Sequence, residues 1–61
     1  YTIKNINAGG NYVYVQTSDD SATLETHGAG IFQTYDNVGN QNGNVVTWVW
    51  GGDAYRVISY G

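Results

Sequence analysis

The sequence predicts an all-β fold, and three features support this prediction. Short runs of β-branched and aromatic residues recur along the chain, several of them alternating with polar residues, as strands do. No segment repeats apolar residues at the i, i+3, i+4, i+7 spacing of an amphipathic helix. Clusters of Gly, Asn, Asp and Ser separate the runs, as turns do. We therefore expect a small meander of about six short strands in one domain, residues 1–61.

Residues 45–60 (VVTWVWGGDAYRVISY) give the strongest strand signal. Two runs of β-branched and aromatic residues flank a Gly-Gly-Asp break, which predicts a hairpin. Because side chains alternate across a strand, Val46, Trp48 and Trp50 are expected on one face, opposite a second face of Val and Thr. Neither face is polar, so we expect both faces of the hairpin to be covered.

Four shorter strand-like runs precede the hairpin. They are residues 1–6 (YTIKNI), 12–17 (YVYVQT), 22–27 (ATLETH) and 31–35 (IFQTY). The third run is the weakest, and a short helical turn after Ser21 is an alternative there. Turns are expected at residues 7–11, 18–21 and 28–30. Residues 36–44 (DNVGNQNGN) are predicted to form one long polar loop, with a turn at Asn42-Gly43, that can vary without harm to the core.

The chain is short for a domain that folds alone. A chain of 61 residues buries only about 60% of the surface that it exposes when unfolded. Small domains are commonly stabilised by disulfides, by a metal or by oligomerisation. The sequence has no Cys and a single His, which excludes disulfides and a thiolate zinc site. Association between copies of the chain is the remaining expectation.

Charged residues are few, and they exclude two classes of partner. The net charge is −3, and Lys4 and Arg56 are the only basic residues besides His27. This composition does not suit a phosphate-binding surface, so no nucleic-acid partner is expected. No apolar run approaches the roughly 18 residues of a membrane span, and no basic amphipathic face is present, so no membrane insertion is expected.

Both ends of the chain carry motifs in a fixed order. The first part reads TIKNI, AGG and YVYV, at residues 2–6, 8–10 and 12–15. The last part reads VTWV, GGD and YRVIS, at residues 46–49, 51–53 and 55–59. Over residues 2–15 and 46–60 this order resembles the C-terminal tip modules of bacteriophage tail fibres and tailspikes. The middle of the chain departs from that pattern, and Trp48 and Trp50 stand where the family has smaller residues.

The resemblance implies a homotrimer of interlocked β-structure, either a triple β-helix or a β-sandwich knob, at the tip of an extracellular virion fibre. Three copies would cover one another's apolar strand faces. The side chains expected in the shared core are Ile3, Val13, Val15, Val46, Trp48 and Val57. Two other classes stay open. One is a free-standing small lectin or carbohydrate-binding module, and the other is a self-assembling fibre subunit, because the Gly-Asn pairs resemble those of curlin repeats.

A glycan on the host cell surface is the expected partner of such a tip, besides further copies of the chain. Aromatic faces stack on sugar rings, while Asn, Gln and Asp make directed hydrogen bonds. The sequence brings these residue types together after the fourth strand-like run and around the hairpin turn. The candidate glycan ligands are Tyr35, Asp36, Asn37, Asn40, Gln41, Asn42, Trp50, Asp53 and Tyr55.

The sequence gives little support to catalysis or to a cofactor. No Ser lies in a nucleophile-elbow pattern, and Glu25 with Asp36 or Asp53 is better explained by surface carboxylates than by a glycosidase pair. His27 lacks the His-x-His context through which the resemblance would imply an axial metal. We expect no catalytic residue, no metal site and no cofactor, and leave open whether three copies of His27 meet on an axis.

Overall fold

The computed structural model of the chain describes residues 1–19 and 21–61, so Asp20 of the predicted turn at residues 18–21 lies outside the described residues. The described residues form seven strands and no helix. The strands are β1 (Thr2–Lys4), β2 (Tyr14–Gln16), β3 (Leu24–Glu25), β4 (Phe32–Gln33), β5 (Tyr35–Asn37), β6 (Val45–Trp50) and β7 (Tyr55–Tyr60). The all-β prediction is confirmed, and the alternative of a helical turn after Ser21 is not found in the described part of the chain.

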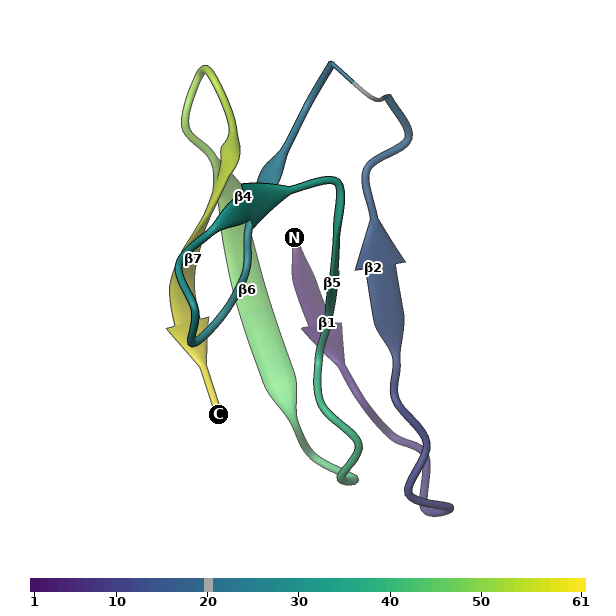
Figure 1. Cartoon of the computed structure of the whole chain (residues 1–61). Coiled ribbons are helices and arrows are strands. Elements are labelled where there is room, and N and C mark those ends of the chain that lie inside the picture. The colour runs from purple at the N-terminus through teal and green to yellow at the C-terminus, as the bar shows by residue number, and fades with distance from the viewer. Residues whose placement is uncertain (20) are drawn as a thin grey trace.

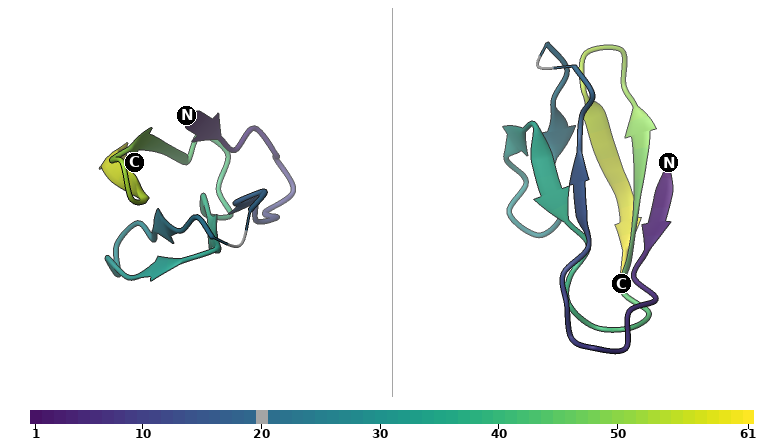
Figure 2. Two further views of the ribbon diagram at one scale, coloured as in Figure 1. Left: turned by 90° about the horizontal axis from the view of Figure 1, so that it is seen from above. Right: turned by 90° about the vertical axis from the view of Figure 1, so that its right-hand side faces the viewer.

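The strands form two sheets in two layers (Figures 1 and 2). One sheet has the order β1-β6-β7-β3-β4, and the other pairs β2 with β5. Every pair is antiparallel except β3 and β7, which run parallel. The predicted meander is therefore wrong. The long β6–β7 hairpin lies inside the larger sheet, and the short strands β1 and β3 pair with its two sides. β3 also pairs with β4, its neighbour in the chain, whereas β1 pairs with β6 alone.

The β6–β7 hairpin has the predicted bounds, with one irregularity in its register. Thr47 lies opposite Ser59, but Trp48 lies opposite Val57, so Ile58 is an extra residue in β7. The Val57 N–H donates to the Glu25 carboxylate, at 2.9 Å. The bulge thus gains a hydrogen bond from a side chain of β3, and it shifts Tyr60 to the position opposite Val46.

The core lies between the two layers and is complete within one copy of the chain. Its buried members are Leu24, Val38, Val46 and Trp48. Ile3, Val13, Val15 and Val57 pack against them, so all six residues predicted for a shared trimer core belong to the core of the single chain. The expectation that Val46 and Trp48 need neighbouring copies is corrected: their exposed fractions in one chain are 1% and 2%. The chain's own second layer contributes the covering side chains Val13, Val15 and Val38.

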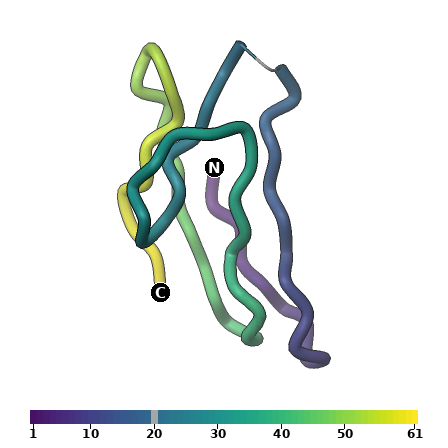
Figure 3. Tube along the Cα trace, in the orientation of Figure 1, coloured from purple at the N-terminus to yellow at the C-terminus, as the bar shows by residue number. Residues whose placement is uncertain are grey.

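Asn5 joins the two turns at one end of the molecule, where residues 7–11 and 39–44 lie side by side (Figure 3). It is fully buried. Its Nδ2 donates to the carbonyl oxygens of Asn11 (3.0 Å) and Gly39 (2.9 Å), and its Oδ1 accepts from the Asn7 N–H (2.8 Å). Its backbone N–H donates to Asn44 O at 2.7 Å. Every polar atom of this buried side chain is therefore satisfied, as burial requires.

The predicted strand at residues 31–35 and the loop after it differ from the structure. The chain bends at Thr34, so that β4 belongs to the larger sheet and β5 to the smaller one. Asp36 lies within β5, and both Asp36 and Val38 are buried. The first part of the predicted loop is thus part of the core and is not free to vary. Gly39 follows at φ 103°, where a Cβ would lie 2.5 Å from Asn44 Oδ1.

Trp48→Ala should remove most of the stability of the single chain. We expect the free energy of unfolding to fall by about 3–5 kcal/mol. This is a large loss, because a typical domain has a free energy of unfolding of only about 0.05–0.15 kcal/mol per residue. Trp50→Ala is the matched control, because Trp50 lies on the same strand but is 51% exposed. It should cost about 0.5–1.5 kcal/mol. Urea unfolding measures both, and equal losses would contradict the assignment of Trp48 to the core.

Candidate functional site

A cleft of about 490 Å³ opens between the two sheets, beside the core. Its volume falls within the range of about 300–1,000 Å³ that is common for small-molecule sites. Trp48 and Leu24, both buried, line it from the larger sheet. The remainder of the lining comes from Tyr1 and Ile3, from the facing ends of β6 and β7, and from residues 15–19 with Ala22. The cleft is therefore a consequence of how the two layers meet.

Three aromatic side chains, Tyr1, Trp50 and Tyr55, line the cleft on the side of the larger sheet; we call them the aromatic group. The ring centroids of Trp50 and Tyr55 lie 4.9 Å apart, and those of Tyr1 and Tyr55 lie 5.9 Å apart with the rings edge to face. Trp50 and Tyr55 are opposite each other in the hairpin register. Tyr1 is aligned by two backbone hydrogen bonds with Trp48, of 2.7 and 2.8 Å. Strand pairing thus sets the positions of all three residues.

The opposite wall of the cleft carries polar residues beside the apolar Val15 and Ala22, and we call it the polar wall. It comprises the side of β2 and the chain after it, with Gln16, Thr17 and Asp19 among the lining residues. The Thr17 N–H donates to Thr34 O at 2.8 Å, which attaches this wall to the chain before β5. The cleft therefore combines aromatic faces on one side with hydrogen-bonding groups on the other.

Asp19 supplies the charge of the polar wall. Its Oδ1 accepts the Ser21 N–H at 2.9 Å, in the Asx turn that the sequence predicted there. Hydrogen bonds from Ser21, first from its backbone N–H and then from its hydroxyl, hold the pKa of Asp19 below its usual 3.8. The carboxylate therefore stays charged, and accepts hydrogen bonds only, throughout the neutral pH range.

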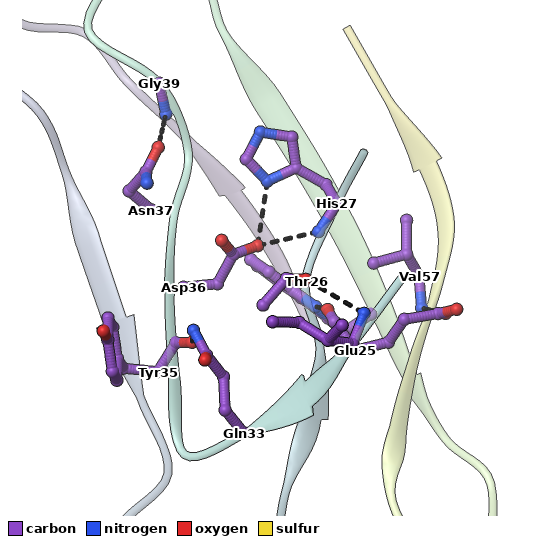
Figure 4. Close-up of polar contacts among 11 residues, drawn as sticks. Glu25, Thr26, His27, Gln33, Tyr35, Asp36, Asn37, Gly39 and Val57 are labelled. Atoms are coloured by element: carbon purple, nitrogen blue, oxygen red, sulfur yellow. Dashed lines mark hydrogen bonds and ion pairs between the residues drawn. The ribbon is translucent and has the colours of Figure 1, made fainter. Parts of the chain in front are cut away.

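A second polar cluster lies where residues 26–30 meet β5 (Figure 4). The Asp36 Oδ2 accepts the His27 backbone N–H at 3.0 Å and lies 2.8 Å from the His27 Nδ1. The ring centroids of His27 and Tyr60 lie 5.6 Å apart. Among the described residues, no group of three or more His, Asp or Glu side chains is placed to hold a metal.

The structure separates the candidate glycan ligands that the sequence grouped together. Trp50 and Tyr55 line the cleft, whereas Asp53 pairs with Arg56 in the exposed hairpin turn, at 3.1 Å. Tyr35 is exposed at the start of β5, but Asp36, next to it, is buried against His27. The Asn37 Oδ1 accepts the Gly39 N–H at 3.0 Å. Asn40, Gln41 and Asn42 lie in the loop beyond the far end of β5 (Figure 3), so they do not share a site with Tyr35.

Sequence reasoning missed Tyr1 and Asp19 as lining residues of the cleft. The alternation of residues 1–6 placed Tyr1 on the same face as Ile3, and this was the one available signal. The pairing of β1 with β6 then brings Tyr1 beside Trp50 and Tyr55. For Asp19 the sequence showed only a turn, because its position depends on the packing of one sheet against the other.

Comparison of the chain with models of protein families, with curated proteins and with solved structures found no match. Among the described residues, no helix has the length and hydrophobicity to cross a membrane. A function must therefore be supported by the chemistry of the cleft and by the pattern of exposed residues.

Asp36→Asn should destabilise the fold, because the buried carboxylate accepts two hydrogen bonds from His27 and an amide replaces one acceptor oxygen by a donor. We expect a loss of about 1–3 kcal/mol in the free energy of unfolding. Asp53→Asn is the matched control, since its pair with Arg56 is exposed and worth about 0–1 kcal/mol. The two variants are compared by urea unfolding, and an equal effect would show that the buried pair has no special weight.

Proposed function

We propose that the cleft is a glycan-binding site. The observation that carries the proposal is the aromatic group, in which Tyr1 and Trp50 are exposed and Tyr55 is half-buried. Its rings lie opposite hydrogen-bonding groups across a cleft of suitable volume. A sugar ring has an apolar face that stacks on aromatic rings and a rim of hydroxyl groups that needs directed hydrogen bonds. The Asp19 carboxylate and the Thr17 hydroxyl oxygen, whose hydrogen is donated to Thr34 O at 3.3 Å, provide acceptors for such a rim.

The proposed activity is binding without cleavage. Most glycoside hydrolases place two carboxyl groups on either side of the scissile bond. Asp19 is the one carboxylate among the described lining residues of the cleft. Of the pairs considered from the sequence, Glu25 bonds to the Val57 N–H and Asp36 to His27, so neither carboxylate is directed to this cleft.

We further propose that the chain acts at the tip of a phage tail fibre or spike, as a homotrimer on the virion that contacts host surface polysaccharide. The ordered resemblance of both ends of the chain supports this setting. A second support is the outer face of the larger sheet, which we define by Val49, Phe32 and Arg56. Val49 and Phe32 are 47% and 44% exposed, and Arg56 lies 5.2 Å above the Phe32 ring. This face would contact the neighbouring copies in place of the face that carries Trp48.

A free-standing lectin or carbohydrate-binding module is the second candidate. The observation that favours it is the closed core, since Val46 and Trp48 are covered without a partner. The accessible surface of one chain, 3961 Å², is also close to the roughly 3,900 Å² expected for a compact monomer of 6.6 kDa. The two candidates share the cleft and differ only in assembly.

Trp50→Ala should weaken glycan binding by at least about tenfold, which corresponds to about 1.4 kcal/mol. A glycan array identifies the ligand, and titration calorimetry with that ligand measures the loss. Tyr35→Ala is the matched control, because Tyr35 is similarly exposed but does not line the cleft. If the double variant Asn40→Ala/Asn42→Ala loses binding while Trp50→Ala retains it, the site lies on the loop beyond β5 and the cleft is excluded.

Native mass spectrometry should show a discrete trimer for a fibre tip, a monomer for a free-standing lectin and an open-ended polymer for a curlin-like subunit. If the outer face makes the trimer contact, Val49→Asp should yield a folded monomer, because it places a carboxylate in an apolar contact. Thr47→Asp is not suitable as a control, since Thr47 Oγ1 hydrogen-bonds Thr2 Oγ1 at 3.0 Å. Tyr14→Asp is suitable, because Tyr14 is on the exposed side of β2, and it should leave the trimer intact.

A further inference from the structure

We propose that the cleft prefers a basic, amine-bearing sugar, such as a glucosamine unit of a polysaccharide, whose ammonium group pairs with the Asp19 carboxylate while its ring contacts the aromatic group. This proposal rests on the proposed glycan-binding function and names the class of sugar. Three separate features of the cleft favour a positively charged ligand over a neutral or an acidic one.

The first feature is the distribution of charge. Asp19 is the only Asp, Glu, Lys, Arg or His among the described lining residues. Lys4 lies opposite Val45 and Arg56 lies opposite Val49 in the strand registers, so both point to the side of the larger sheet away from Trp48. A sugar that carries a carboxylate or a sulfate would meet Asp19 in the cleft with no Lys, Arg or His side chain from the described lining to offset it.

The second feature is the aromatic group itself. The faces of Tyr and Trp rings carry negative electrostatic potential and attract cations at distances of up to about 6 Å. Trp50 and Tyr1 are exposed, so a ligand in the cleft can reach their rings. These rings stabilise the same sign of charge as the carboxylate on the opposite wall. From these rings, a neutral sugar would gain the stacking contact without the attraction between the rings and a cation.

The third feature is that Asp19 stays ionised when the amine is protonated. Its hydrogen bonds from Ser21 keep its pKa below 3.8. The ion pair therefore forms at any pH above the lowered pKa of Asp19 and below the pKa of the sugar amine. It is lost as the pH rises through the pKa of the amine. Tyr1 and Tyr55 are the other titratable side chains of the described lining, and neither carries a positive charge in any protonation state. The α-ammonium group of Tyr1 is the one positive group of the described lining, and it donates to the Trp48 carbonyl oxygen at 2.7 Å.

Titration calorimetry with three tetrasaccharides tests the proposal. The tetramers of glucosamine and N-acetylglucosamine share one linkage and differ in whether the nitrogen is charged, and a galacturonic acid tetramer carries the opposite charge. At a pH below the pKa of the amine, the glucosamine tetramer should bind about two- to fivefold more tightly than its N-acetyl counterpart, as expected for an exposed ion pair. The galacturonic acid tetramer should bind least. Added salt should reduce the preference.

Asp19→Asn should abolish the preference for the amine, so that the tetramers of glucosamine and N-acetylglucosamine bind the variant equally tightly. The amide oxygen still accepts the Ser21 N–H, so the turn is retained, which urea unfolding verifies. Asp53→Asn removes an exposed carboxylate outside the cleft and should keep the preference. Equal affinity of the unaltered chain for both sugars, or a preference that survives Asp19→Asn, would overturn this proposal. If other glycans bind but none of these tetramers does, the amine is also excluded, whereas the absence of any glycan binding would overturn the proposed function itself.

Discussion

The structure depends on covering the inner face of the β6–β7 hairpin. That face carries Val46 and Trp48, the most apolar part of a chain with little apolar surface to bury. The small sheet of β2 and β5, with Val38 after it, supplies the cover and leaves a space where the aromatic group and the polar wall face each other. The packing of the two layers therefore determines both the core and the proposed binding site, because the layers are in contact over the core and the cleft opens beside it.

The local parts of this structure could be predicted from the sequence. The bounds of the hairpin follow from alternation within a few residues, and so does the inward facing of Val13 and Val15, in β2 and just before it. The sheet order could not be predicted, because it depends on pairs such as β1 with β6 that are distant in the chain. Val38 was also missed. A single Val among Asn and Gly residues shows no periodicity, and only the packing of β5 reveals that it belongs to the core.

The candidate site was predictable to a similar extent. Trp50 and Tyr55 were found because both aromatic residues flank the hairpin turn in the sequence. Asp36 was misjudged as a surface residue, since its Asn-rich context is polar and its partner His27 lies in another turn. The polar wall of the cleft required knowledge of how the sheets pack. The oligomeric expectation rested on the short chain, on the absence of Cys and on the two apolar faces of the hairpin. None of these reveals that one copy already covers Trp48.

The pairing of β1 with β6 has a consequence for how the chain folds. Thr2 and Thr47 are 45 positions apart, and the parallel contact of β3 with β7 also closes a long segment. Domains dominated by such distant contacts fold slowly, because the entropy of closing the loops is lost before the contacts form. The rate-limiting barrier should therefore involve docking of the N-terminal strand onto a preformed hairpin, while the Tyr1 side of the cleft is assembled last.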